Sequence, residues 1–204
     1  GDILFSVVMP VYNVDIKWLD KAIESIEKQN YQNWEICIAD DCSTRQEVRD
    51  HLAEIKDSRI KIKLLEKNQG ISGATNEAAA LASGDYILLM DNDDELAPSA
   101  LHEFYQKIRK EGSEIIYSDM DIIDAKGKTR DPLCKPDWSP DLFLSQMYLG
   151  HLVGFKRSLF EEVGGFRSEF NGSQDYDLLL RMTEKTDKIG HISEILYHWR
   201  DLPS

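Results

Sequence analysis

Strands and helices alternate four times over the first 110 residues, and no other feature narrows the possible folds as far. Short apolar runs predict the strands, and apolar residues at steps of three and four predict the helices. The predicted strands cover residues 5–10, 34–39, 60–65 and 86–90, and the predicted helices 16–26, 46–55, 72–82 and 99–110. Asp15 and Ser43 are expected to cap the first two helices. Repeated strand–helix units form a parallel sheet with right-handed crossovers. Alternating lysines favour an edge position for residues 60–65.

Beyond residue 110 the pattern becomes mixed. Residues 115–119 and 195–200 are predicted to be strands, 125–128 a hairpin tip, 131–140 an ordered loop, and 157–163 and 175–185 helices. No interdomain linker is visible, so this half is expected to pack onto the same sheet. The predicted fold class is therefore α/β, with a mostly parallel central sheet flanked by helices and a mixed second half. We expect a single domain over residues 1–204, with halves at 1–110 and 111–204.

The charge balance restricts the partners of this chain. Lys and Arg number 24 against 37 Asp and Glu, a net charge of −13, which argues against nucleic acid or an anionic membrane surface. No apolar stretch approaches the roughly 20 residues that cross a bilayer.

The three cysteines (Cys37, Cys42 and Cys134) are odd in number and lack metal-site spacing. We expect a reducing, cytoplasmic location, with the inner face of the membrane as the alternative.

Polar residues follow three of the predicted parallel strands. They are Pro10-Val11-Tyr12-Asn13, Asp40-Asp41 and Asp91-Asn92-Asp93-Asp94. Ligands bind at the carboxyl ends of strands in such sheets, so these clusters are expected to converge. The last cluster has two interpretations. Oxygen ligands on a loop suit Mg²⁺ or Mn²⁺, often together with a substrate phosphate. Alternatively, the acids are a solvated loop in which Asp94 or Ser99 caps the next helix.

The order of several motifs resembles one enzyme family. The motifs are Val8-Met9-Pro10-Val11-Tyr12-Asn13, Ile38-Ala39-Asp40-Asp41, Asn68-Gln69-Gly70, Ala74-Thr75-Asn76, Gly84-Asp85-Tyr86, the acid cluster, Gly164-Gly165-Phe166 and Gln174-Asp175-Tyr176-Asp177. Together they resemble the inverting family 2 glycosyltransferases with the nucleotide-diphosphosugar transferase (GT-A) fold, over nearly the whole chain. Lys135-Pro136-Asp137-Trp138-Ser139-Pro140-Asp141 and Leu196-Tyr197-His198-Trp199-Arg200 look like a bacterial branch that builds surface polysaccharides, often as one domain of a longer polypeptide.

The resemblance implies a role for each motif. Asp93, Asp91 and His198 would bind a Mn²⁺ or Mg²⁺ ion. The alternative for His198 is packing within a strand. Asp175 would be the general base, whereas Asp177 is more simply a first-turn helix acid. The implied donor-binding residues are Pro10, Tyr12, Asn13, Asp40, Asp41, Gly70, Asn76, Asp91 and Asn92. The implied donor is a nucleotide-diphosphate sugar, first of all a UDP-sugar, and the acceptor a glycan or lipid-linked saccharide.

Other interpretations of these residues stay open. Tyr12 can serve loop packing, and Asp40 and Asp41 can cap a helix. For His151 core packing is favoured over a place in the sugar or acceptor pocket. Surface or strand positions are expected for His51, His102 and His191, and solvated faces for Lys67, Arg157 and Arg181. The chain also departs from its relatives, which often carry arginine at Thr75, glutamate at Gln174 and an acid at Met120.

Two other functions compete with the transferase hypothesis. Haloacid-dehalogenase-like phosphatases also place two aspartates after a strand, but with glycine and a hydroxyl residue next, where Asp94 and Glu95 stand here. A non-catalytic domain that binds a sugar nucleotide or a partner chain is the second alternative. The presence of Asp91, Asp93 and Asp175 speaks against it.

Overall fold

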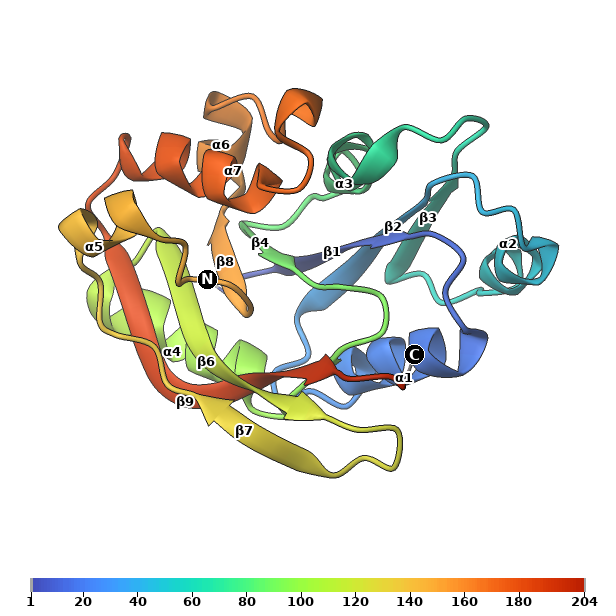
Figure 1. The fold of residues 1–204 in the computed structure, drawn as a ribbon, viewed down its shortest axis with the longest axis horizontal. Coiled ribbons are helices and arrows are strands. Elements are labelled where there is room, and N and C mark those ends of the chain that lie inside the picture. Colours follow the sequence, from blue (N-terminus) through green and yellow to red (C-terminus); the bar gives the residue numbers. More distant parts are fainter. Residues whose placement is uncertain (1, 204) are drawn as a thin grey trace.

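The computed structural model describes residues 2–203 and has one sheet of nine strands over that range (Figure 1). The strands are β1 (Phe5–Val11), β2 (Trp34–Asp40), β3 (Ile60–Leu64), β4 (Tyr86–Leu89), β5 (Glu95–Leu96), β6 (Ile115–Ile123), β7 (Thr129–Leu133), β8 (Val153–Lys156) and β9 (Ile189–Arg200). Their order is β3-β2-β1-β4-β8-β6-β9-β5, with β7 paired to β6. The predicted α/β class and the edge position of β3 are confirmed.

The parallel and mixed parts of the sheet meet at β4. Strands β3, β2, β1 and β4 are parallel, as the strand–helix alternation predicts. Strand β8 then runs antiparallel to both β4 and β6, while β6 and β9 are parallel to each other. The amino-terminal end of β8 therefore lies at the same edge of the sheet as the carboxyl end of β4. This inversion places a segment of the second half beside the acid cluster.

Helices cover both faces of the sheet. They are α1 (Ile16–Glu27), α2 (Gln46–Ala53), α3 (Gly70–Ala79), α4 (Ala100–Glu111), α5 (Pro140–Ser145), α6 (Arg157–Glu162) and α7 (Gln174–Thr183), with a short 3₁₀ helix at Ser168–Phe170. In Figure 1, α3, α6 and α7 lie above the sheet and α1 and α4 below it. Side chains alternate between the faces along each strand, so Val7 and Met9 pack with α1 while Val8 packs with α3.

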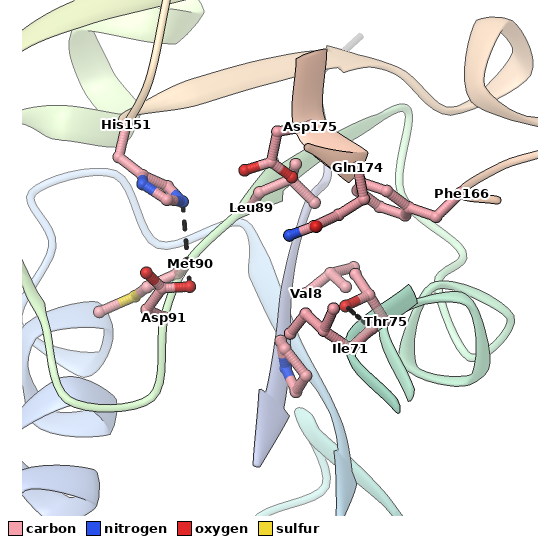
Figure 2. A pocket seen from close by; sticks show the side chains of 11 residues that line it. Val8, Ile71, Thr75, Leu89, Met90, Asp91, His151, Phe166, Gln174 and Asp175 are labelled. Atoms are coloured by element: carbon pink, nitrogen blue, oxygen red, sulfur yellow. Dashed lines mark hydrogen bonds and ion pairs between the residues drawn. The ribbon is translucent and has the colours of Figure 1, made fainter. Parts of the chain in front are cut away.

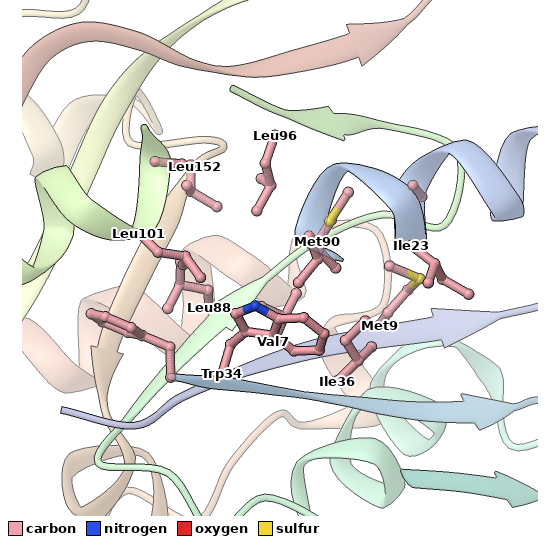
Figure 3. Close-up of a cluster of buried hydrophobic side chains, with 14 of the residues drawn as sticks. Val7, Met9, Ile23, Trp34, Ile36, Leu88, Met90, Leu96, Leu101 and Leu152 are labelled. Carbon is pink, nitrogen blue, oxygen red and sulfur yellow. The ribbon is translucent and has the colours of Figure 1, made fainter. Parts of the chain in front are cut away.

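Two apolar clusters result, and Figure 3 shows part of the one beneath the sheet, around Trp34 and Met90. Because both faces of the central strands are buried, these strands are continuous apolar runs in the sequence. Cys37 is buried in the upper cluster, and burial raises the pKa of its thiol to about 12. This cysteine therefore acts as a small apolar side chain, as predicted.

The helix starts are partly as predicted. Asp15 caps α1 by accepting a hydrogen bond from the Lys17 amide at 2.9 Å. The prediction for Ser43 is wrong, because Arg45 is the N-cap residue of α2 and makes no side-chain cap bond. The Ser43 hydroxyl instead binds the buried Asp40 carboxylate. A buried carboxylate requires donors, and this demand outweighs the local capping pattern.

The second half contains three differences from the sequence prediction. Residues 129–133 form β7, although 131–140 was expected to be a loop. Strand β9 begins at Ile189, six residues before the predicted start, and its pairing with β6 contains register shifts. Strand β5 and helix α5 were not predicted. These elements are short or interrupted by bulges, so hydrophobic periodicity reveals little of them.

Candidate active site

The carboxyl ends of β1, β2 and β4 surround two adjoining hollows, as the convergence of polar clusters predicts. They enclose about 320 Å³ and about 580 Å³ of space open to solvent, and both are lined by Pro10 and Ile71. The first also contains Asp91, His151, Gln174 and Asp175. The second is lined by Val11, Tyr12, Asp41, Asn68, Gly70, Ala74 and Asn92. We refer to them as the carboxylate hollow and the Tyr12 hollow.

The Tyr12 hollow combines an exposed aromatic ring with a fixed carboxylate. Tyr12 is 47% exposed at the end of β1. The Asp41 carboxylate accepts hydrogen bonds from the Gln69 amide at 2.6 Å and the Gly70 amide at 3.1 Å. Gly70 has φ of 79°, a conformation that favours glycine, and it begins α3. These bonds fix the loop between β3 and α3 as one wall of the hollow.

The carboxylate hollow brings together three ionisable side chains from distant parts of the chain (Figure 2). Asp91 follows β4, His151 precedes β8, and Asp175 lies in the first turn of α7. His151 Nε2 is 4.0 Å from an Asp91 carboxylate oxygen, and its ring stacks on Tyr197 with centroids 4.8 Å apart. Burial raises the pKa of Asp175, the charge of His151 opposes that shift, and Asp91 adds to it. The Asp175 carboxylate therefore holds a proton more tightly than an ordinary aspartate.

The loop that carries the acids is anchored from β9. The Tyr197 hydroxyl bonds to the Asp94 carboxylate and accepts a hydrogen bond from the Asp91 amide at 3.1 Å. Arg200 donates its amide to Asp94 at 2.8 Å and its Nε to the Asp93 carbonyl at 3.0 Å. Burial, together with the charge of Asp91, raises the pKa of Asp94 to about 8. Asp94 is therefore the buried anchor of this loop and not a helix cap.

Asp91, Asp93 and His198 were predicted as metal ligands. Within residues 2–203 no group of three or more His, Cys, Asp or Glu side chains is gathered closely enough to hold an ion. The chemistry of the residues nevertheless fits a cation. Burial and the charge of Asp91 raise the pKa of Asp93, as expected of neighbouring carboxylates without a counter-ion. His198 Nδ1 binds the Asp121 carboxylate, which leaves Nε2 for another partner. Histidines that ligate a metal through one ring nitrogen are commonly oriented by such a bond from the other nitrogen.

Three predicted donor-binding residues lie outside both hollows. Asp40 is fully buried, and its carboxylate accepts hydrogen bonds from Ser43 and, at 2.8 Å, from Arg49. The Asn76 amide exchanges two hydrogen bonds of 2.9 Å with the main chain of Phe166. Asn13 binds the loop before α2. The polar atoms of these three side chains make hydrogen bonds within the fold, and a role in donor binding stays a prediction for them.

The structure corrects two predictions for other polar residues. His151 faces the carboxylate hollow and is not a core residue. His191 lies in strand β9, as predicted, and its two ring nitrogens contact Asp119 at 2.8 Å and Asp137 at 2.6 Å. Arg181 is mostly buried and binds Asp177 at 2.8 Å. Asp177 is structural, as predicted.

No lysine or arginine of the described residues lines either hollow. Thr75 lines the carboxylate hollow with a neutral side chain. An anion with several charges would therefore meet the carboxylates of Asp41, Asp91 and Asp175. Among the residues that line the two hollows, His151 has the side chain that can carry a positive charge. Within residues 2–203, no helix has the length and apolar character needed to cross a bilayer.

Comparison with known proteins agrees with this geometry. The profile described as glycosyl transferase family 2 matches residues 6–164. The chain is 45% identical, over 98% of its length, to uncharacterized protein y4gI of Sinorhizobium fredii, and 37% identical, over 97%, to the O-antigen biosynthesis protein RfbC of Myxococcus xanthus. It spans only 23% and 16% of those two proteins. It is also 32% identical, over 88% of its length and 66% of the relative, to the putative colanic acid biosynthesis glycosyl transferase WcaA of Escherichia coli.

The fold is shared with solved structures. The crystal structure of S. aureus TarS 1-349 in complex with UDP-GlcNAc matches with a TM-score of 0.81 at 20% identity, over 99% of this chain and 60% of the TarS 1-349 chain. The same part of TarS in complex with UDP matches with a TM-score of 0.77. At this identity the likeness concerns the fold alone.

Proposed function

This chain belongs to glycosyl transferase family 2, and we propose that it transfers a sugar, with inversion, from a nucleotide-diphosphate donor to a hydroxyl of a glycan or lipid-linked saccharide. One observation carries the proposal. Asp175 and Asp91, 84 positions apart in the sequence, line the same hollow, and a second hollow suited to a nucleoside adjoins it. This arrangement supplies a base, a place for the leaving group and a place for its nucleoside.

The donor is a UDP-sugar in this proposal. The Tyr12 ring lies against the base, and the Asp41 carboxylate accepts a hydrogen bond from the base or ribose. Support comes from the walls of the Tyr12 hollow, which present one aromatic face and few polar groups, as small-molecule sites commonly do. The UDP and UDP-GlcNAc complexes of the TarS fold also favour this assignment.

The diphosphate occupies the junction of the two hollows. Because no lysine or arginine of the described residues lines them, its charge needs another partner. Asp91 and Asp93, together with His198, would hold Mn²⁺ or Mg²⁺, which would neutralise charge on the departing diphosphate. His151, beside Asp91, is placed to donate a hydrogen bond to an oxygen of the same group.

Asp175 is the general base of the proposed reaction. It accepts the proton of the acceptor hydroxyl as that oxygen attacks the sugar from the side opposite the diphosphate. The raised pKa of Asp175 suits this task, since a stronger base removes the proton more readily. Its position across the carboxylate hollow from Asp91 separates the attacking oxygen from the leaving group.

The acceptor belongs to a bacterial surface polysaccharide. The O-antigen and colanic acid names of two relatives support this assignment. Since the chain spans only a small part of the O-antigen relative, other domains of a longer polypeptide are proposed as partners.

A thermal-shift experiment with Mn²⁺ and UDP tests the donor site. We expect a rise in Tm for the wild type, a loss of that rise in Asp93→Ala, and the full rise in the control Asp141→Ala, which removes an exposed acid on α5. Asp175→Asn should retain the rise while losing sugar transfer. Normal turnover by Asp175→Asn would refute the base assignment. A Tm rise without transfer to any acceptor would support the binding-domain alternative, and no rise with any nucleotide would contradict the donor site.

A further inference from the structure

The segment that begins at Lys135 has no part in the proposed chemistry, yet it carries an unusual buried cation. Lys135 follows β7 and is only 8% exposed. Burial lowers the pKa of its ammonium to about 8, although attraction to Asp119 opposes the shift. Burying a charge is unfavourable unless its surroundings compensate, so a buried lysine calls for an explanation beyond stability.

The ammonium binds the turn that carries His151. Lys135 Nζ donates hydrogen bonds to the main-chain carbonyl of Leu149 and, at 2.6 Å, to that of His151. Gly150, between these two residues, has φ of 52°, so the turn uses a conformation that favours glycine. One side chain therefore holds both ends of a three-residue turn.

The other end of Lys135 is fixed to the sheet. The Asp119 carboxylate of β6 accepts hydrogen bonds from the Lys135 amide at 3.0 Å and from His191 Nε2 at 2.8 Å. The Tyr117 hydroxyl donates to the Pro136 carbonyl at 2.7 Å. The His191 ring stacks on the Tyr117 ring at 4.6 Å. Through these contacts the position of the ammonium is defined by β6 and β9.

The turn held in this way positions one wall of the carboxylate hollow. His151 lies within 4.0 Å of Asp91 and stacks on Tyr197, the tyrosine that anchors the acid loop. Among residues 2–203, no side chain forms a hydrogen bond with the His151 ring, and its contact with Asp91 is longer than a hydrogen bond. The direction of the ring therefore depends on its stacking on Tyr197 and on the main chain of residues 149–151.

We propose that Lys135 is a positioning residue, whose ammonium clamps the turn at residues 149–151 and thereby aims His151 at Asp91 beside Asp175. The inference rests on the proposed function, since His151 matters only if the hollow is the place of transfer. Lys135 touches neither donor nor acceptor. Its removal should lower the rate of transfer while the Tyr12 hollow, which shares only Pro10 and Ile71 with the carboxylate hollow, stays intact.

The test compares Lys135→Met with Lys61→Met. Lys61 is a control for the loss of an ammonium far from the carboxylate hollow: on the edge strand β3 it binds the Leu81 carbonyl at 3.1 Å and the buried Glu35 carboxylate at 2.8 Å, so its removal lowers stability without touching the residues that line the hollow. The first readout is the ring Cε1–Hε1 NMR signal of each histidine, with the His151 signal assigned through His151→Gln. We expect Lys135→Met to shift the His151 signal and to leave those of His51 and His102 in place, whereas Lys61→Met shifts none of these three.

The second readout is UDP release from UDP-N-acetylglucosamine with Mn²⁺. Lys135→Met should lower kcat between about tenfold and about a hundredfold, as expected for a misplaced group, with KM for the donor changed by less than about twofold. Lys61→Met should keep the wild-type kcat. Should Lys135→Met prove unstable, Gly150→Ala disturbs the same turn without removing the ammonium and should give the same pattern.

The outcomes separate this inference from the proposed function. An unmoved His151 signal in both Lys135→Met and Gly150→Ala refutes the clamp, whether or not the chain transfers sugar. A shifted signal with unchanged kcat shows that the clamp has no role in transfer and refutes the positioning role. Absence of UDP release from the wild type counts against the proposed function with this donor and leaves the NMR result to decide on the clamp.

Discussion

Replacing Tyr197 by phenylalanine tests whether β9 anchors the acid loop. The ring of Tyr197 is fully buried and would keep its stacking on His151, so the change removes only the hydroxyl. Two groups then lose a partner: the Asp94 carboxylate, which is fully buried, and the Asp91 amide. The perturbation is therefore confined to the hydrogen bonds that place the loop.

The magnitude follows from the burial of Asp94. A buried polar group that loses its partner costs about 1–3 kcal/mol, and the Asp91 amide lies closer to solvent, so we expect a destabilisation of about 2 kcal/mol. For a chain of this size, that corresponds to a fall in Tm of about 4–8 °C. Because the loop carries Asp91 and Asp93, binding of UDP with Mn²⁺ should weaken in the same variant.

Urea unfolding and calorimetric titration with Mn²⁺ and UDP provide the measurements. Tyr105→Phe is the matched control, since Tyr105 stacks on Tyr31 at 5.0 Å and its hydroxyl has no hydrogen-bond partner among the described residues. It should change the free energy of unfolding by less than about 0.5 kcal/mol. Equal unfolding free energies for the two variants would refute the anchoring role of the hydroxyl. A destabilised Tyr197→Phe with wild-type affinity would show that the loop holds its ligands without β9.

Three further predictions concern pH and the buried acids. Burial opposes ionisation of Glu35, but hydrogen bonds from neighbouring residues outweigh it and lower its pKa to about 2. This group should contribute about 3 kcal/mol of stability above pH 4.5, lost as the pH falls toward 2, and acid unfolding of Glu35→Gln should lack that component. The raised pKa of Asp175 should place the acid limb of the transfer rate above the ordinary aspartate range, and Asp175→Asn should lower kcat by about 10²–10⁴, measured as UDP release across pH. Arg49→Leu leaves the buried Asp40 without its cation and should destabilise by about 3 kcal/mol in urea, with unchanged affinity for UDP, because Asp40 lies outside the Tyr12 hollow.

The parallel half of the fold was predictable because its signals are local. The central strands are buried on both faces and therefore appear as continuous apolar runs, and the helices between them have apolar residues at helical spacing. The carboxyl edge follows from the parallel order, and with it the place of Tyr12, Asp41 and Asp91. The role of Asp175 came from a family resemblance and not from local pattern, and it stays a prediction.

Tertiary contacts decided the rest. Asp40 and Asp41 are adjacent in the sequence, but Asp40 is buried and bound to Arg49, whereas Asp41 lines the Tyr12 hollow. Neighbouring side chains at the end of a strand point to opposite sides of the sheet. His151 reached the site because β8 runs antiparallel between β4 and β6, a pairing that no local pattern specifies. Sequence alone determined the class of sheet and the edge where chemistry can occur, since both depend on residues close along the chain. Which side chains meet at that edge depended on contacts between distant segments, and only the folded chain brings those segments together.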